Sequence, residues 1–197
     1  RIVNSNFKKY YEFLNKEFHL SFRNYSELHE WSVTDIENFW ESIWKFSGII
    51  HSTSYQTILN ERSMPGANWF KGSKLNFAEN LLRFRDDHVA IISSREDKPD
   101  YKITYKELYE LVAVCSTGLK ELGIKRGDRI AGFVTNIPET IVAMLATTSL
   151  GAVWTSCSPD FGIQGVIDRF GQVKPKLLFA IEEYQYNGKL INSLERI

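Results

Sequence analysis

The sequence predicts an α/β protein with two parts. Residues 1–87 form a helical N-terminal region, and residues 88–197 form the first βα units of a parallel, three-layer sheet domain. The first part is rich in aromatic residues at helical spacing. In the second part, short apolar runs alternate with amphipathic segments at intervals of about 10–15 residues, which is typical of βαβ units. The chain begins at Arg1, and its βα units stop without a natural end, so we expect a truncated sheet domain.

The composition argues against several classes of function. The chain has 24 Lys and Arg and 24 Asp and Glu, so its formal net charge is zero and no basic surface is indicated. We therefore expect neither nucleic acid nor a membrane as a main partner. No apolar run approaches the ~18 residues that a membrane-spanning helix needs, and no secretory signal is visible. These features predict a cytoplasmic protein.

The cysteines and histidines do not indicate a metal site. Cys115 and Cys157 lie far apart in apolar or small-residue surroundings, as reduced thiols of a cytosolic protein do. The four histidines are scattered without zinc-ligand spacing. We expect no metal ligand among these residues.

The best helix of the first part is expected from Thr34 to about Ser47. Thr34 and Glu37 fit a capping box, in which each side chain satisfies a free N–H group at the helix start. Gly48 suits the end of the helix. One broad stripe of this helix is apolar: Ile36, Phe39, Trp40, Ile43 and Trp44. We expect this stripe to pack against the second part of the chain.

In the second part, the sequence pattern predicts alternating strands and helices. Just before this part, a short helix is expected to start at Asn76. Strands are expected at His88–Ser93, Lys102–Ile103, Arg129–Thr135, Ala152–Ser156 and Lys176–Ala180. Thr104 and Glu107 fit a second capping box, and Pro138 suits the first turn of the next helix. Asp160 is expected to cap a further helix, and a last helix is expected from about Gly188 to Ile197.

Four segments could carry chemistry, because parallel sheets bind ligands beyond the carboxyl ends of their strands. The loop Thr155–Gly162 follows a predicted strand and contains hydroxyl side chains and a glycine. It precedes the start of a predicted helix, whose free N–H groups suit an anion. The alternative, which we favour, is that this loop only shapes the chain.

The segment Tyr184–Leu190 places Lys189 near an expected helix start. A cation is unfavourable there unless a bound anion neutralises it. A solvated lysine is the alternative. The turn in Leu122–Arg129 lies at the amino edge and reads as a connector.

The fourth segment is a charge cluster before the first strand of the sheet domain. It comprises Arg83, Arg85, Asp86 and Asp87. Such a cluster is usually a solvated connector. None of the four segments forms a catalytic triad, a carboxylate pair or a metal cluster.

Several stretches resemble a known family. Four are similar to the start of acyl-CoA synthetases of the acetyl-CoA synthetase type: Trp31–Ser32, Phe39–Gly48, Asn68–Phe70 and Leu75–Arg83. Two resemble early core motifs of adenylate-forming enzymes: Ile103–Leu108 and Ser149–Trp154. Three more resemble the acetoacetate-activating branch: Cys157–Gly162, Asp168–Phe179 and Tyr186–Lys189.

The resemblance implies an ATP-dependent acid–thiol ligase. The carboxylate of acetoacetate would attack the α-phosphate of ATP, giving an acyl-adenylate and pyrophosphate, and the thiol of coenzyme A would then displace AMP. Mg²⁺ would offset the phosphate charge. The family's phosphate loop, TSGTTGxPK, does not occur in these 197 residues, nor does its lid with a catalytic lysine. We therefore expect no catalytic residue here and no activity without the rest of the same polypeptide.

One site carries over by position. The resemblance implies a coenzyme A contact at Tyr186, Asn187, Gly188 and Lys189, and Tyr186 stands where relatives carry a charged residue. Two alternatives stay open. The parent could act on another short acid, such as acetate or propionate, or the chain could be a non-enzymatic module that binds a partner through its Trp40 and Trp44 face.

Overall fold

The computed structural model describes residues 5–194 and residue 197. The chain divides into two compact units, residues 1–75 and 76–197. The short helix α4 (Phe77–Leu81) falls in the second unit, where it packs against α6 (Pro138–Ser149). The predicted division at residue 87 stays a prediction. In the described residues, no helix is long and apolar enough to cross a membrane.

The first unit is built around three helices, α1 (Asn6–Phe18), α2 (Tyr25–Thr34) and α3 (Ile36–Phe46). Its core consists of Tyr10, Leu14 and Leu28, surrounded by a layer of partly buried aromatic rings. The Tyr10 hydroxyl and the buried Ser42 hydroxyl share a hydrogen bond of 2.5 Å, which satisfies both polar groups inside the core. A two-stranded antiparallel ribbon follows, β1 (Thr57–Leu59) and β2 (Trp69–Lys71).

The predicted helix from Thr34 to Ser47 is wrong at its start. The chain breaks at Asp35, so Thr34 ends α2 and Asp35 precedes α3 without a side-chain cap. The predicted capping box does not form because both side chains bind elsewhere. The Thr34 hydroxyl donates to the carbonyl of Glu30 (2.8 Å), and the Glu37 carboxylate accepts from Arg62 (2.5 Å).

The end of this helix and part of its apolar stripe are accounted for within the unit. Gly48 has a φ of 57° and its N–H donates to the carbonyl of Lys45, which confirms the predicted stop. The Trp44 ring packs on Phe70 at 4.6 Å between centroids, and Trp40 meets Trp69 edge-on at 5.9 Å. The predicted packing of this stripe on the second part stays a prediction.

The second unit contains a parallel sheet in the order β6–β5–β7, which confirms the predicted fold class. Its three strands are β6 (Val153–Cys157), β5 (Arg129–Phe133) and β7 (Leu177–Ala180). Two antiparallel hairpins flank it in sequence. They are β3 (Val89–Ser93) with β4 (Tyr101–Thr104), and β8 (Glu183–Tyr186) with β9 (Lys189–Asn192).

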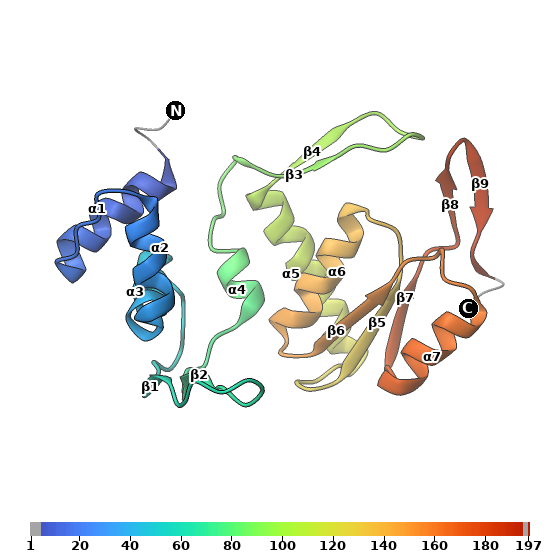
Figure 1. Ribbon diagram of the computed structural model, residues 1–197. Coiled ribbons are helices and arrows are strands. Elements are labelled where there is room, and N and C mark those ends of the chain that lie inside the picture. The colour runs from blue at the N-terminus through green and yellow to red at the C-terminus, as the bar shows by residue number, and fades with distance from the viewer. Residues whose placement is uncertain (1–4, 195–196) are drawn as a thin grey trace. The chain divides into compact units, whose positions relative to one another are not determined.

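Helices cover both faces of this sheet, which makes the unit three-layered (Figure 1). Ile130 of β5 lies in one cluster with residues of α5 (Tyr105–Glu121) and α6. Its neighbours Ala131 and Phe133 belong to a second cluster with Val166 and Phe170 of α7 (Ile163–Val173). The central strand is therefore buried on both sides, as its continuous apolar run predicts.

Capping confirms two further predictions. The Thr104 hydroxyl accepts from the N–H of Glu107, whose carboxylate accepts from the N–H of Thr104. The Asn76 side chain accepts from the N–H of Glu79 at the start of α4. Its amide also donates to the carbonyls of Thr148 and Ser149 (both 3.1 Å), so one residue satisfies groups at the ends of two helices.

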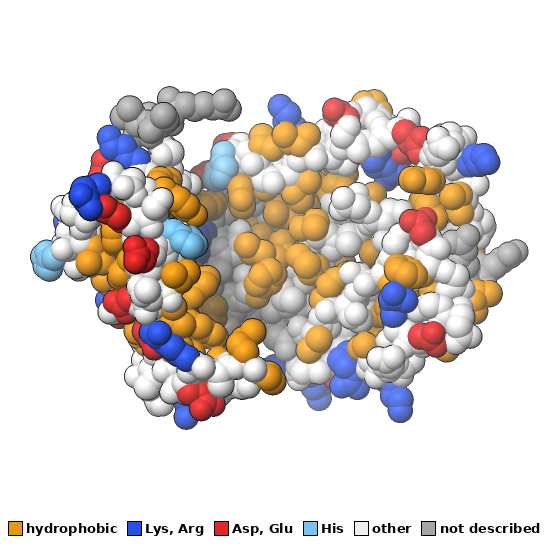
Figure 2. All heavy atoms as spheres, in the orientation of Figure 1, with side chains coloured by type: hydrophobic (Ala, Val, Ile, Leu, Met, Phe, Trp, Pro, Cys, Tyr) orange, Lys and Arg blue, Asp and Glu red, His pale blue; other side chains and the backbone are white. Residues whose placement is uncertain are grey.

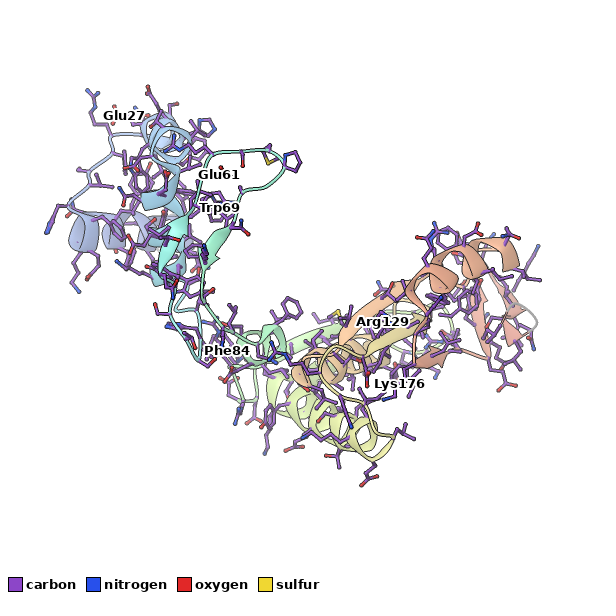
Figure 3. All side chains as sticks on the ribbon, turned by 90° about the horizontal axis from the view of Figure 1, so that it is seen from below. Glu27, Glu61, Trp69, Phe84, Arg129 and Lys176 are labelled. Atoms are coloured by element: carbon purple, nitrogen blue, oxygen red, sulfur yellow. The ribbon has the colours of Figure 1, made fainter. Side chains whose placement is uncertain are left out.

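The amino edge of the sheet carries basic residues that are used internally. Figure 3 labels Arg129, at the start of β5, and Lys176, just before β7. The Lys176 ammonium donates to the Asp128 carboxylate (2.8 Å) and to the carbonyl of Gly123 (2.7 Å). The Arg129 guanidinium donates to the carbonyl of Val173. These contacts tie the turn before β5 to β7 and α7, in keeping with the predicted connector.

A glycine of β5 makes room for a tryptophan on the sheet, and this predicts a stability effect. A Cβ at Gly132 would lie 2.7 Å from the outer ring atoms of Trp154, whose ring packs near Phe179. We expect Gly132→Ala to lower the free energy of unfolding by about 1–3 kcal/mol, because the indole must move out of its packed position. Urea unfolding measures the change.

The matched control is Gly118→Ala in α5. A Cβ there meets nothing within 4 Å, so the substitution should raise stability by about 1 kcal/mol through helix propensity. Equal stability of Gly132→Ala and the unsubstituted chain would contradict the packing argument.

Candidate functional site

The sheet order creates a crevice at the carboxyl ends of β5 and β6. The chain leaves β5 toward α6 on one face and leaves β6 toward α7 on the other. When the loops after two adjacent strands run to opposite faces of a sheet, a gap opens between the loops. Doubly wound sheets bind their ligands in this gap. The candidate site is therefore the region around residues 134–137 and 158–162.

A cavity of about 440 Å³ occupies this position. Four segments line it: residues 95–97 of the β3–β4 loop, residues 135–137 after β5, Ser158 and Asp160 after β6, and residues 184–186 of β8. The predicted loop Thr155–Gly162 thus contributes to the crevice. The turn in Leu122–Arg129 does not line it.

Asp160 joins two of these segments. One carboxylate oxygen accepts from the Tyr184 hydroxyl (2.8 Å), and the other accepts from the Ser158 hydroxyl (2.8 Å). The prediction that Asp160 caps the following helix is wrong. Gly162 occupies the cap position of α7, without a side-chain bond, because the Asp160 carboxylate is turned toward β8.

The β3–β4 loop supplies a charged wall. The Arg95 guanidinium donates two hydrogen bonds to the Asp97 carboxylate, at 2.8 and 2.6 Å. The two side chains are only 24% and 19% exposed. The bond to Asp97 raises the pKa of Arg95, and the bond from Arg95 lowers the pKa of Asp97, so both groups stay charged as a pair.

The predicted helix from Gly188 to Ile197 is wrong over its described residues, because β8 and β9 form a hairpin there. Asn187 and Gly188 make its two-residue turn, with φ values of 52° and 70°. Asn-Gly between strands is the sequence that favours such a turn, since both residues tolerate positive φ. Lys189 therefore begins strand β9, and the helix-dipole argument for it does not apply. Residues 195–196 lie outside the described part.

The structure brings together only part of the sequence-predicted site. Tyr186 lines the crevice, and the residue is 64% exposed. Asn187 and Gly188 form the hairpin tip, and Lys189 is exposed beside it. The Gly188 N–H donates to the Glu96 carboxylate at 3.0 Å, which links the tip to the β3–β4 loop.

Sequence reasoning missed Arg95, Glu96 and Asp97, and it included Tyr184 in a candidate segment without finding its contact with Asp160. The first three follow an antiparallel strand outside the parallel sheet, and no rule for parallel strands points to them. The signal for Tyr184 was the Asn-Gly turn, because recognising a hairpin there would have placed Tyr184 on its inward face.

The other candidates are structural. Both cysteines are free, and burial raises the pKa of the Cys115 and Cys157 thiols, so neither is an activated nucleophile. In the charge cluster, Arg85 stacks over the Tyr109 ring and Asp86 pairs with His88. The cluster thus makes a cation–π contact and an ion pair, and its role as a solvated connector stays a prediction.

A larger groove, of about 830 Å³, lies among β4, α5 and α6. Its lining is mainly apolar, and Figure 2 shows hydrophobic side chains gathered over α5 and α6. Its charged rim is mostly acidic: Glu107, Glu110 and Glu139, with Lys102. The groove lacks converging donors for a phosphorylated ligand, so the smaller polar crevice is the better candidate site.

Two family comparisons identify this architecture. The AMP-binding enzyme family matches residues 77–196. The chain belongs to the AMP-binding enzyme family. The acetyl-coenzyme A synthetase N-terminus family matches residues 25–81.

Three relatives of this family member are informative. The acetoacetyl-CoA synthetase of Xenopus tropicalis is 44% identical over 93% of this chain and 28% of the relative. A malonamoyl-CoA synthetase of Penicillium aethiopicum is 42% identical over 90% and 26%. The solved acetoacetyl-CoA synthetase from Streptomyces lividans matches with a TM-score of 0.92 and 37% identity, over 99% of this chain and 31% of that one. The chain thus spans about a quarter to a third of the length of these relatives.

The contact between Asp160 and Tyr184 yields a second prediction. Tyr184→Phe keeps the buried ring but removes the hydroxyl donor, and should lower the free energy of unfolding by about 1 kcal/mol. A double-mutant cycle with Asp160→Ala should give a coupling energy of about 0.5–1.5 kcal/mol. Tyr186→Phe, at an exposed position of the same strand, is the control and should be neutral. Zero coupling would contradict the assigned role of Asp160.

Proposed function

We propose that this chain is the N-terminal part of an ATP-dependent acid–thiol ligase that converts acetoacetate, ATP and coenzyme A to acetoacetyl-CoA, AMP and pyrophosphate. The main support is the joint agreement in sequence and fold with acetoacetyl-CoA synthetases over nearly all of the chain. We further propose that the parent enzyme works in the cytoplasm, with its substrates held by this chain and the rest of the same polypeptide.

The first half-reaction is assigned to the rest of the polypeptide. The acetoacetate carboxylate would attack the α-phosphate of ATP and release pyrophosphate, and a bound Mg²⁺ would offset the phosphate charge. Among the described residues, no group of three His, Cys, Asp or Glu could hold a metal ion. The printed sequence also lacks the family's glycine-rich phosphate loop. No step of adenylate formation is therefore routed through these residues.

The second half-reaction gives this chain its role, a contact with coenzyme A at Tyr186, Asn187, Gly188 and Lys189. Coenzyme A carries phosphates and an adenine ring. The exposed Lys189 ammonium suits a phosphate as a point charge. The exposed Tyr186 ring offers a face on which an adenine can stack. A Cβ at Gly188 would meet nothing within 4 Å, so a ligand can approach that side of the hairpin tip while the Gly188 N–H stays bound to Glu96.

A second candidate differs in the acid. Identity to a malonamoyl-CoA synthetase is nearly as high as identity to acetoacetyl-CoA synthetases. A parent ligase for another short acid, such as acetate or propionate, is therefore the alternative. Activity of the complete enzyme across a panel of short acids decides between them. If the complete polypeptide shows no ligase activity on any acid, a partner-binding module that uses the Trp40 face becomes the better explanation.

The 197-residue polypeptide should form no acyl-adenylate by itself. We expect no exchange of labelled pyrophosphate into ATP with acetoacetate, because the groups that bind the ATP phosphates are assigned elsewhere. The complete enzyme, assayed in parallel, should exchange readily. Robust exchange by the 197 residues alone would overturn this division of roles.

Lys189→Ala in the complete enzyme should raise the KM for coenzyme A about tenfold, because a charge-assisted phosphate contact is lost. Pyrophosphate exchange, which needs no coenzyme A, should be unchanged. The control is Lys120→Ala, which removes an exposed ammonium from the far end of α5 and should leave both values unchanged. An unchanged KM in Lys189→Ala would remove Lys189 from the site.

A further inference from the structure

The hairpin of β8 and β9 needs support from outside itself. It has two strands, and no third strand pairs with it in the described part of the chain. An isolated two-stranded hairpin is marginally stable in water. Its base is anchored, because the buried Tyr184 binds Asp160 and the buried Ser193 hydroxyl donates to the carbonyl of Ile181. These bonds fix the base of the hairpin but not its tip, which needs a separate contact.

That contact is made by Glu96. Its carboxylate accepts from the Gly188 N–H at 3.0 Å, across a separation of 92 residues in sequence. In a two-residue turn, the N–H of the second turn residue is not part of the strand ladder. Gly188 can therefore donate outward, and Glu96 is the acceptor placed to receive this bond.

Glu96 is itself held in place by its neighbours. Arg95 and Asp97, on either side of it, are bound to each other through two hydrogen bonds and are largely sheltered from solvent. The charges of Arg95 and Asp97 neutralise each other. Among these three residues, the Glu96 carboxylate is therefore the one charge without an ion-pair partner within the group. The loop therefore presents its carboxylate to the hairpin from a fixed base.

We propose that Glu96 is a positioning residue for coenzyme A binding: it holds the Asn187–Gly188 tip and thereby orients Lys189. This inference rests on the proposed function and adds a residue to that site. The negative charge of Glu96 would by itself repel a phosphate of coenzyme A. Glu96 therefore favours binding only through the hydrogen bond that it accepts from Gly188. A competing role, in which Glu96 blocks an N–H that a phosphate would bind, predicts a change of the opposite sign.

Kinetics of the complete enzyme distinguish these roles. Glu96→Ala should raise the KM for coenzyme A about threefold to tenfold, with kcat and pyrophosphate exchange unchanged. Glu96→Gln should restore the KM, because its amide oxygen still accepts from Gly188. Asp100→Ala removes an exposed carboxylate from the same loop and should have no effect. An unchanged or lowered KM in Glu96→Ala, or no rescue by Gln, overturns the proposal.

Amide hydrogen exchange on the 197-residue chain tests the positioning without coenzyme A. The Gly188 N–H should lose protection in Glu96→Ala and keep it in Glu96→Gln. Equal protection in all forms would overturn the structural half of the proposal.

A double variant separates this proposal from the proposed function. If Glu96 acts through Lys189, the KM of Glu96→Ala with Lys189→Ala should rise by less than the product of the single effects. An unchanged KM in Lys189→Ala alone overturns the coenzyme A contact, and with it the role of Glu96. A raised KM in Lys189→Ala beside an unchanged KM in Glu96→Ala overturns only the role of Glu96.

Discussion

The hydrogen-bonded position of β5 between β6 and β7 is the constraint on which the second unit depends. From β5 the chain steps to one neighbour through α6, and from β6 it steps back past β5 through α7. The two steps run in opposite directions over opposite faces, so both crossovers have the same hand, as the chirality of βαβ units requires. The loops after β5 and β6 must then part, and the crevice opens between them.

Side chains around this crevice are held by one another. Arg95 pairs with Asp97, and Asp160 accepts from both Ser158 and Tyr184. Such bonds fix the orientation of the side chains in the crevice walls. They also pair the polar groups of these side chains with one another. The proposed ligand contact accordingly lies at the rim, on the hairpin tip, where Tyr186 and Lys189 are exposed. The zero net charge of the chain fits this arrangement, since binding would depend on local donors and not on an overall field.

Local signals predicted most elements of the sheet domain. The five predicted strands and the Thr104–Glu107 capping box are confirmed, because apolar periodicity and capping act over a few neighbouring residues. The errors arose where a side chain bound a distant group or a turn signal was overlooked. Thr34 and Glu37 fit a capping box, but Glu37 pairs with Arg62. At the candidate site, the resemblance indicated Tyr186 and Gly188, whereas Glu96 is linked to the tip only by the fold.

The sequence by itself determined the α/β class, the order of strands and helices, the family resemblance and the segment of the proposed coenzyme A contact. Each depends on residue type and short-range spacing. Only the tertiary structure decided that Asp160 faces Tyr184 instead of capping a helix, and that Glu96 meets Gly188. These contacts join residues far apart in the chain, and they form because the parallel sheet and its two flanking hairpins bring separate loops to one edge.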